Sequence, residues 1–318
     1  MTTLPLAVEH FAGPPHWAWY IWGYFFLAGL TGGSYVLATM LRLWGEPGDE
    51  AAARLGFSIS FPALVLCPVL LTVDLGQPSR FWHMLINTTP GSVAPNFISW
   101  SPMSVGVWAL LVFGVFSTVS FVEVMSRDAG GGPARLAGRI MDGVFGRAFM
   151  VVGSVLGLFI ASYTGVLLAV SNQPVWSDTW ALGGLFLASG LSGSAALIAL
   201  LTPRRREAAV SEERLHRADG YFAVLELLLI AVFLVTLALT GTAGQTLRLP
   251  WTLLWVLVLV SLVPPLAGLV GRPPTLVGAG AQGEAIAAQR TAVAAAWAPL
   301  LVLVGVLALR AVVIFSAQ

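Results

Sequence analysis

Eight long apolar runs are the feature that most constrains what this sequence can form. A hydrocarbon layer about 30 Å thick takes about 20 apolar residues per helix to cross. Backbone polar groups find no water inside that layer, so each run is predicted to be a helix with internal hydrogen bonds. The eight predicted spans are residues 17–43, 55–73, 100–124, 149–170, 180–201, 221–240, 251–270 and 292–316.

The scarcity of charge supports the same fold class. Charged residues make up 10% of the 318-residue chain, whereas soluble domains carry about 25%. We therefore predict an all-α integral membrane protein with eight membrane-spanning helices. We expect residues 1–145 to hold three spans and an outer loop at 76–99, residues 146–178 to hold the fourth span, and residues 179–318 to hold the last four.

The first residues bear on whether the chain has a signal peptide, and the single cysteine bears on disulfides and iron–sulfur clusters. Residues 1–15 contain Glu9 and His10 but no basic residue, so no cleavable signal peptide is predicted and the first span is expected to direct insertion. Cys67 is the only cysteine. It therefore excludes an internal disulfide and an iron–sulfur cluster held by several thiolates of this chain.

Arginines define the expected orientation. The chain has no lysine, and thirteen of its sixteen arginines follow the first, third, fifth and seventh spans or flank those helix ends. These thirteen are Arg42, Arg54, Arg127, Arg135, Arg139, Arg147, Arg204, Arg205, Arg206, Arg214, Arg217, Arg272 and Arg290. Only Arg80, Arg248 and Arg310 lie elsewhere. The positive-inside bias therefore predicts that both termini and loop 76–99 lie outside the cytoplasm.

A short motif of small residues occurs twice. Residues 28–34 read AGLTGGS and residues 189–195 read SGLSGSA, at similar depths in the first and fifth spans. Small residues let helix backbones approach closely in a membrane. The recurrence four spans later predicts two four-helix halves, although small-residue faces also recur by chance in helix bundles.

Ionisable residues inside the spans are costly and need partners or a function. Glu123 and Arg127 are four residues apart, which favours an ion pair at the inner end of the third span. Asp219 and Glu226 share one face of the sixth span, either as a proton path or as structural groups, with Glu226 neutral or paired with an arginine such as Arg310. Arg310 itself must meet a carboxylate, backbone carbonyls or water. Glu123 is also a candidate for the proton path.

The stretch DLGQPSRFWHML, residues 74–85, ends an apolar span with polar side chains. Asp74 and His83 can carry protons, and Arg80 can hold an anionic or carbonyl group. In a structural interpretation, Asp74 caps the turn or pairs with Arg80, and His83 lies at the lipid head groups. A functional interpretation makes the stretch one wall of a binding site.

A second polar cluster is predicted at the same height. Tyr163 lies in the fourth span, where a hydroxyl without a partner would be costly. His16, Tyr20 and Tyr24 are spaced by four residues, which predicts that they share one face of the first helix. Interfacial aromatic belts explain the neighbouring tryptophans, whereas Tyr24 lies deeper.

The chain resembles the NrfD/PsrC family, which comprises the membrane subunits of polysulfide reductase and of related molybdopterin oxidoreductases. The matching segments are GLTGG at 29–33, DLGQPSRFWH at 74–83, SPMSVGVW at 101–108, SYTGVLLA at 162–169 and ALRAVVIFSAQ at 308–318. They lie in order along nearly the whole chain, which is more specific than any one of them.

The resemblance implies a fold and a set of partners. It implies eight helices in two four-helix bundles, with no haem or iron–sulfur cluster in this chain and no nucleic acid partner. Such subunits dock an extracytoplasmic ferredoxin-like subunit that carries four [4Fe–4S] clusters, with a molybdopterin or other catalytic subunit beyond it. They exchange electrons with menaquinone or ubiquinone in a bacterial cytoplasmic membrane.

The resemblance also suggests roles for residues near the outer face. Asp74 and His83 are expected to relay protons, and Tyr163 is expected to bind a quinone carbonyl. Further expected quinone contacts are Tyr20, Tyr24, Arg80, His16 and Trp82. Family members have an asparagine and a histidine one turn apart where this chain has Tyr20 and Tyr24. That departure moves the expected proton acceptor to His83 or Asp74, with His16 as a further candidate.

Three other functions remain open. A haem anchor needs axial ligands, commonly histidines, but His10, His16, His83 and His216 all fall at helix ends or in loops. A secondary transporter usually has inverted repeats and a site near the midplane, whereas this repeat keeps its orientation. A membrane anchor without its own quinone site is the third alternative.

Overall fold

The computed structural model describes Gly13, residues 15–132, Arg135, Gly138 and residues 141–202, 211–270 and 281–318, without the side chains of 270 and 281–296. Regular structure in these residues is helical, apart from a hairpin in which β1 (Ile86–Asn87) pairs antiparallel with β2 (Ala94–Pro95). Residues named above that lie outside the described residues are Glu9, His10, Arg139, Arg204, Arg205, Arg206 and Arg272.

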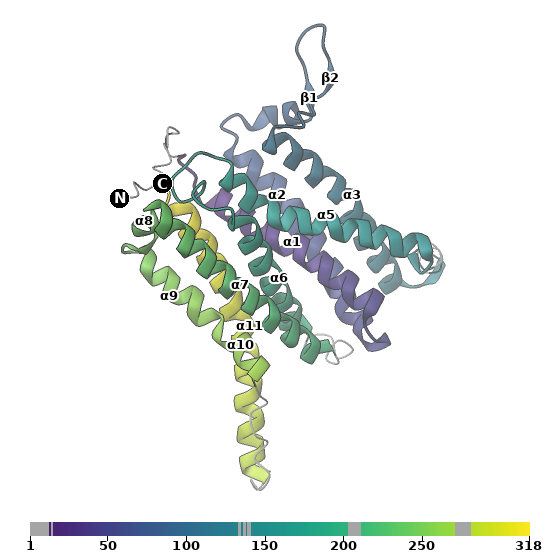
Figure 1. The fold of residues 1–318 in the computed structure, drawn as a ribbon. Coiled ribbons are helices and arrows are strands. Elements are labelled where there is room, and N and C mark those ends of the chain that lie inside the picture. Colours follow the sequence, from purple (N-terminus) through teal and green to yellow (C-terminus); the bar gives the residue numbers. More distant parts are fainter. Residues whose placement is uncertain are drawn as a thin grey trace.

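Within the described residues, eight helical segments are long and apolar enough to cross a membrane, as predicted (Figure 1). They are α1 (Trp19–Trp44), α2 (Glu50–Asp74), α3 (Pro102–Ala129), α5 (Val144–Ala169), α6 (Leu182–Leu201), α7 (Glu212–Thr240), α9 (Trp251–Ser261) with α10 (Val263–Val270), and α11 (Ala281–Phe315). Shorter helices are η1 (Pro47–Asp49), η2 (Pro78–Met84) and α8 (Ala243–Leu247).

Local sequence explains several helix ends. Pro102 opens α3, where a missing N–H costs nothing, and the Ser101 side chain accepts a hydrogen bond from the Ser104 N–H. Gly241 ends α7 in the left-handed region, with φ 83°, a conformation that glycine adopts without steric cost.

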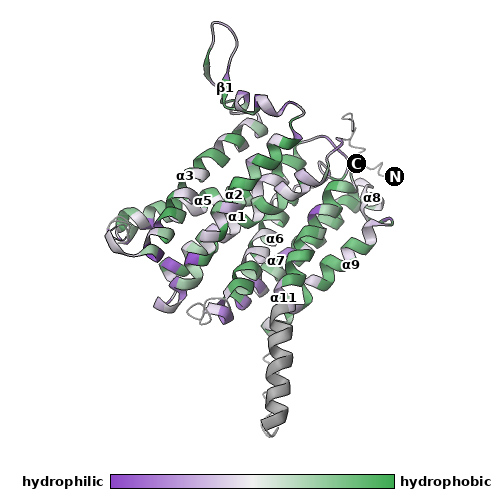
Figure 2. Cartoon of the chain, turned by 180° about the vertical axis from the view of Figure 1, so that it is seen from behind, coloured by the Kyte–Doolittle hydropathy of each residue, from purple (hydrophilic) through white to green (hydrophobic). Residues whose placement is uncertain are grey.

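Three helices form the centre of the molecule. In the most apolar stretch of each span, 78% of the residues are buried in α1, 72% in α6 and 61% in α11, against 22 to 33% in the others. The peripheral helices expose apolar side chains such as Val155 and Leu228. Figure 2 shows hydrophobic colour along the helices and strongly hydrophilic colour mainly near one end. Outward apolar faces fit contact with lipid.

The two copies of the small-residue motif pack against each other at this centre. A Cβ atom on Gly29 of α1 would lie 3.3 Å from the Cα of Gly190 on α6. Ser194 of α6 donates a hydrogen bond to the Leu30 carbonyl, at 3.2 Å. α1 also contacts α2, α5 and α11, while α6 also contacts α5, α7 and α11. The repeated motif therefore forms the seam between residues 15–169, the first half, and residues 182–318, the second half.

The seventh span is interrupted. The sequence predicted one helix over 251–270, but α9 ends at Ser261 and α10 begins at Val263. Pro264 and Pro265 follow the break. A proline removes a backbone donor and clashes with the preceding turn, so two in succession account for the interruption.

Candidate functional site

The helices have two ends with different chemistry. The hairpin end carries η2, the β1–β2 hairpin, the start of α1 and the end of α11. The arginine-rich end carries the end of α1, η1 and the start of α7. Most of the predicted quinone contacts lie at the hairpin end.

The 74–85 stretch forms the end of α2 and then η2. Asp74 is half-buried, whereas Arg80, Trp82 and His83 are exposed. In the described part of the chain neither Asp74 nor Arg80 has an ion-pair partner, so the predicted interfacial pair does not form. The rings of Trp82 and His83 lie 4.0 Å apart, and the Trp82 indole donates to the Ser79 carbonyl at 3.1 Å.

Asn96 attaches this turn to α3. Its side-chain amide donates to the His83 carbonyl at 3.1 Å. Its own carbonyl accepts hydrogen bonds from Ser104 at 3.2 Å and from the Trp108 indole at 3.0 Å. The position of His83 is therefore fixed relative to the first turns of α3.

Tyr163 meets the same part of α3 from α5. It is 6% exposed, and its hydroxyl donates to the Pro102 carbonyl at 2.5 Å. Gly106 leaves room for the phenol, because a Cβ at that position would overlap the ring. The hydroxyl has one proton, which Pro102 already receives, so its free lone pair can accept a hydrogen bond from a ligand.

The predicted site residues near the start of α1 differ in burial and in whether they belong to the helix. Tyr24 is buried, and Cys67 and Tyr163 are close enough to interact electrostatically with its phenol group. Tyr20 is half-buried beside Trp19, with ring centroids 5.7 Å apart. His16 is exposed and precedes α1. The prediction of one shared helical face was therefore wrong for His16, since helical spacing does not apply before the helix begins.

The loop between α5 and α6 contains residues that sequence reasoning missed. The Trp176 indole donates to the Val313 carbonyl of α11 at 2.7 Å and stacks on Trp17, with ring centroids 5.1 Å apart. Asp178 is buried and accepts a 2.9 Å hydrogen bond from the Val175 N–H. The sequence signal that could have identified these residues was an aspartate close to tryptophans in a predicted outer loop. The loop joins the start of α1 to the end of α11.

Arg310 lies fully buried at the seam between the halves. Its guanidinium donates to the carbonyls of Phe25 on α1 and Phe186 on α6, both at 3.1 Å, and to the Ser189 hydroxyl at 2.7 Å. Phe25 and Phe186 occupy equivalent positions, each three residues before its copy of the motif. Of the predicted alternatives, backbone carbonyls are therefore the groups that Arg310 binds.

Glu226 lies near Arg310 but does not bind it directly. Glu226 is 1% exposed, and its Oε2 has no hydrogen-bond partner among the described residues. The two side chains interact electrostatically, without an ion pair at contact distance in the described chain.

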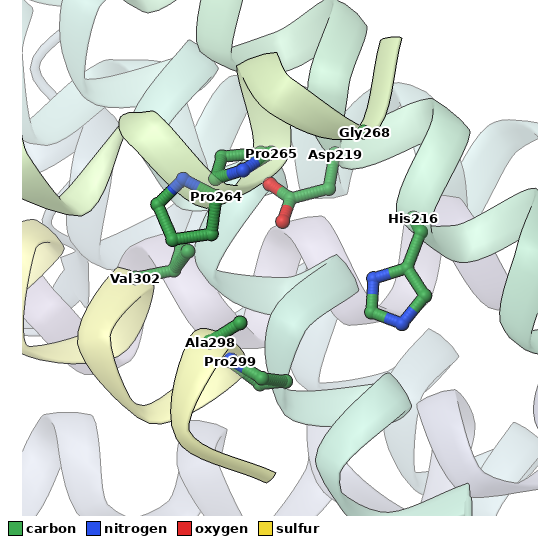
Figure 3. Close-up of a pocket in the computed structure, with 8 residues that line it drawn as sticks. All are labelled: His216, Asp219, Pro264, Pro265, Gly268, Ala298, Pro299 and Val302. Carbon is green, nitrogen blue, oxygen red and sulfur yellow. The ribbon is translucent and has the colours of Figure 1, made fainter. Parts of the chain in front are cut away.

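Asp219 lies on α7 at the edge of a cavity of about 80 Å³ (Figure 3). It is 5% exposed, and its Oδ1 accepts a 2.6 Å hydrogen bond from the Ser192 hydroxyl of α6. The other lining residues in the described part of the chain are His216, Pro264, Pro265, Gly268, Ala298, Pro299 and Val302. The cavity therefore lies against the interrupted seventh span.

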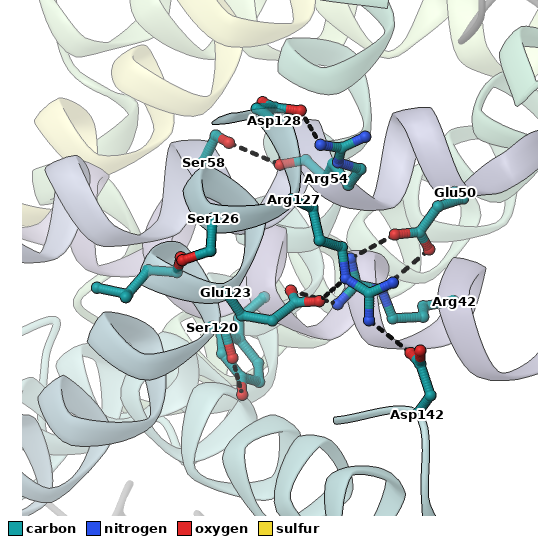
Figure 4. A network of polar contacts seen from close by, with 12 residues as sticks. Arg42, Glu50, Arg54, Ser58, Ser120, Glu123, Ser126, Arg127, Asp128 and Asp142 are labelled. Carbon is teal, nitrogen blue, oxygen red and sulfur yellow. Dashed lines mark hydrogen bonds and ion pairs between the residues drawn. The ribbon is translucent and has the colours of Figure 1, made fainter. Parts of the chain in front are cut away.

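Glu123 belongs to a network at the arginine-rich end (Figure 4). Its carboxylate accepts from Arg42 at 2.9 Å and from Arg127, which confirms the predicted helix-end pair. Arg42 also binds Glu50 at 2.6 Å, and Arg127 binds Asp142 at 2.5 Å. With arginines on both oxygens, Glu123 belongs to an ion network that joins α1, α2 and α3.

A second ion cluster at this end joins the two halves. Asp49 of η1 is fully buried and binds Arg214 of α7. It also accepts hydrogen bonds from the Ser211 hydroxyl at 2.7 Å and the Glu46 N–H at 2.8 Å. Sequence reasoning missed Asp49, because only the tertiary structure brings η1 to the start of α7.

Comparison with known proteins places the chain in a family. The model of the family described as polysulphide reductase, NrfD, matches residues 8–318. The chain belongs to the NrfD family. The resemblance drawn from five sequence segments is thereby confirmed.

The known proteins that are similar to this chain match different shares of its length. A polysulfide reductase chain of Wolinella succinogenes is 27% identical over 71% of this protein and 71% of its own length. Protein NrfD of Escherichia coli is 27% identical over 72% of this protein and 73% of its own length. A selenate reductase subunit of Mesobacillus selenatarsenatis is 30% identical, but over 30% of this protein and 22% of its own length. As a member of the NrfD family, this chain is similar to membrane subunits of reductase complexes.

Proposed function

We propose that this chain exchanges electrons between a membrane quinone, menaquinone or ubiquinone, and an iron–sulfur partner subunit at its hairpin end. The complex would be a respiratory oxidoreductase in a bacterial cytoplasmic membrane. Support comes from the family, from the eight apolar helices and from the arginine distribution, which favours a hairpin end and both termini outside the cytoplasm. The chain would comprise two four-helix bundles that meet along the α1–α6 seam.

The observation that carries this proposal is the contact between Tyr163 and the start of α3. The Pro102 carbonyl takes the only proton of the phenol, so the Tyr163 oxygen is ready to accept a hydrogen bond. A quinol hydroxyl can donate such a bond, whereas a quinone carbonyl cannot. The observed arrangement therefore favours binding of the quinol form, and quinone binding would require the phenol to turn from Pro102.

The remaining polar groups are assigned around that contact. Tyr24 lies near Tyr163 and would hold the far oxygen of the head group, with Tyr20 or Arg80 as the alternative donor. Asp74 and His83 would pass protons to the surface. Trp82 and His16 would lie at the rim.

The hairpin end also offers a surface for the iron–sulfur partner. Val93, Phe97 and Trp100 are 74%, 58% and 85% exposed next to the hairpin. Exposed apolar side chains in an ordered loop favour a protein interface. We assign this surface to a ferredoxin-like subunit with four [4Fe–4S] clusters, with a molybdopterin or other catalytic subunit beyond it.

Replacement of Tyr163 by phenylalanine tests the quinone site. Tyr163→Phe should lower quinone-linked turnover about tenfold or more, because it removes a hydrogen bond to the head group. Tyr35→Phe is the matched control, since Tyr35 is also buried in the first half and its hydroxyl bonds Ser120 at 2.9 Å. Both variants should assemble, and only Tyr163→Phe should lose turnover. Equal turnover in the two variants would remove Tyr163 from the site, and a complex without extractable quinone would favour the anchor function.

A second candidate function is an inward proton path through Asp219, Glu226 and Arg310. The specific observation is the buried Oε2 of Glu226, which has no hydrogen-bond partner among the described residues. Asp219 lies about two turns away on the same helix and reaches the cavity at the arginine-rich end. In proteoliposomes, Glu226→Gln should lower the number of protons moved per electron. An unchanged ratio would eliminate the path.

A further inference from the structure

A groove at the arginine-rich end lies between the two halves of the molecule. The last turns of α1, the residues that follow α1 and the first turns of α7 line a space of about 330 Å³. It shares no described lining residue with the cavity beside Asp219. Ligand sites commonly have volumes of about 300–1,000 Å³. The groove is therefore large enough to hold part of a membrane lipid.

The inner part of the groove is apolar. The side chains that line it from α1 are those of Leu37, Met40, Leu41 and Trp44. Their spacing of three and four residues places them on one helical face. Leu37 and Leu215 of α7 are 4% and 2% exposed and belong to one buried hydrophobic cluster, which forms the floor. Met40 and Trp44 are 48% and 72% exposed. The otherwise central helix α1 thus leaves an apolar face open in its last turns, which suits a hydrocarbon chain.

Two opposite charges lie at the rim of the groove. Glu46 follows α1, Arg214 belongs to the first turn of α7, and the two form an ion pair. Arg214 also binds the fully buried Asp49, which fixes the position of the guanidinium. These contacts with described residues use two of its five N–H groups. The side chains of Arg214 and Glu46 are still 41% and 68% exposed. Each can therefore bind one more polar group.

The order of these residues matches the order of groups in a phospholipid. Trp44 ends α1, and tryptophan is typical of the head-group region of a membrane. Leu37 lies about two turns deeper. The charged rim is therefore at the depth of head groups, and the apolar floor is at the depth of acyl chains. A phosphate can accept hydrogen bonds from Arg214, while a primary ammonium group can donate to Glu46.

The local charge distinguishes between classes of lipid. Residues 40–50 and 211–218 together contain five carboxylates, three arginines and one histidine. Arg42 and Arg217 are already bound by other carboxylates. These two segments therefore offer no excess of positive charge to a lipid with net negative charge. A choline head group is neutral overall, but its quaternary ammonium has no N–H to donate. The rim fits a zwitterionic head group with a primary ammonium.

We propose that this groove binds one molecule of phosphatidylethanolamine. The Arg214 guanidinium donates to the lipid phosphate, and the Glu46 carboxylate accepts from the lipid ammonium. One acyl chain lies along the open apolar face of α1, against Met40 and Leu41. Because α1 belongs to the first half and α7 to the second, the lipid contacts both halves and stabilises the folded chain.

Lipid binding to the purified full-length protein tests the proposal without reference to quinone turnover. The protein is stripped of lipid in detergent and titrated with dioleoyl phosphatidylethanolamine, phosphatidylcholine or phosphatidylglycerol, and native mass spectrometry counts the bound molecules. One phosphatidylethanolamine should bind about tenfold more tightly than either other lipid, because only it makes both charged hydrogen bonds without excess negative charge. Tm should rise in the same order. Equal binding of the three lipids would overturn the proposal.

Two variants locate the lipid. Glu46→Gln keeps the shape of the side chain and should lower the affinity for phosphatidylethanolamine to that for phosphatidylcholine. Ala218→Phe fills the groove, since Ala218 is half-buried in its wall, and should abolish the tight binding of phosphatidylethanolamine. Ala231→Phe is the matched control, because Ala231 is exposed on the same helix, and it should bind lipid as the wild type does.

The results that contradict the proposal are distinct. Tight binding of phosphatidylethanolamine that persists in Ala218→Phe would place the lipid elsewhere. Unchanged lipid binding together with loss of a co-purifying subunit in Ala218→Phe would assign the groove to a protein partner instead. If a variant fails to fold, the wild-type comparison of the three lipids still decides between selective and non-selective binding.

Discussion

The two halves of the molecule use one motif for different purposes. In α1, Thr31 meets Ser60 and, through it, Ser117, so three helices are joined by neutral hydrogen bonds. In α6, the equivalent Ser192 meets Asp219 beside a cavity. Hydroxyl pairs stabilise a membrane bundle modestly at little cost, whereas a buried carboxylate is costly and is typical of ion or proton pathways. The difference indicates that the first half packs at this place through neutral hydroxyl groups, while the second half places the buried carboxylate of Asp219 there.

The most destabilising test addresses Arg310, which binds equivalent carbonyls of both halves. Arg310→Ala should lower the free energy of unfolding by at least about 3 kcal/mol, because it removes buried charge-assisted hydrogen bonds and leaves a cavity. Chemical unfolding in detergent measures the effect. The exposed Arg217, which pairs with Glu213 at 3.0 Å, is the control, and its alanine variant should change stability by under about 0.5 kcal/mol. Similar losses in both variants would mean that Arg310 does not hold the halves together.

The next test compares the buried ion network around Glu123 with the exposed ion pair of Glu213 and Arg217. Glu123→Gln should cost about 1.5–3 kcal/mol, since Arg42 and Arg127 both lose a buried charged partner. Glu213→Gln removes an exposed helical pair from the second half and should cost only about 0.5 kcal/mol or less. Unfolding curves of the two variants under one condition make the comparison. A small loss for Glu123→Gln would show that its network adds little to the first half.

The seam between the halves can be tested with one methyl group. Gly29→Ala places a Cβ 2.8 Å from the Arg310 Nη2 atom and 3.3 Å from the Gly190 Cα. Such overpacking should cost about 1–3 kcal/mol. Gly114→Ala is the control, because its nearest neighbour would be a Leu64 methyl at 3.8 Å, and alanine favours a helix over glycine by about 1 kcal/mol. Opposite signs are expected for the changes in Tm, and two positive changes would contradict the close crossing.

The smallest expected effect concerns the neutral cluster of the first half. Ser60→Ala should lower stability by about 0.6 kcal/mol, the average for hydrogen bonds between membrane helices, and by no more than about 1.7 kcal/mol, their maximum. Ser126→Ala is the matched change, because among the described residues the Ser126 hydroxyl bonds within its own helix, to the Val122 carbonyl. Its effect on Tm should be near zero. Loss of quinone-linked turnover in Ser60→Ala at normal assembly would assign the cluster a role beyond packing.

The residues of the candidate site at the hairpin end could be singled out from the sequence, but their contacts could not. Composition and spacing singled out Tyr163 and His83, yet the Pro102 carbonyl and the Asn96 bridge were not predicted. Backbone carbonyls carry no sequence signal, so a hydrogen bond to one cannot be read from residue types. Similarly, the predicted Asp74–Arg80 pair depended on a turn geometry that the sequence does not specify.

The sequence by itself determined that the chain forms eight apolar helices, and the small residues of its repeated motif indicated which helices can approach closely. Run length and composition suffice for this, because a backbone in hydrocarbon has few ways to satisfy its polar groups. Only the tertiary structure decided that α1, α6 and α11 lie at the centre, that Arg310 joins equivalent carbonyls, and that Asp219 faces a cavity at an interrupted helix. Those features depend on which faces of similarly apolar helices meet, and apolar composition is nearly the same on every face.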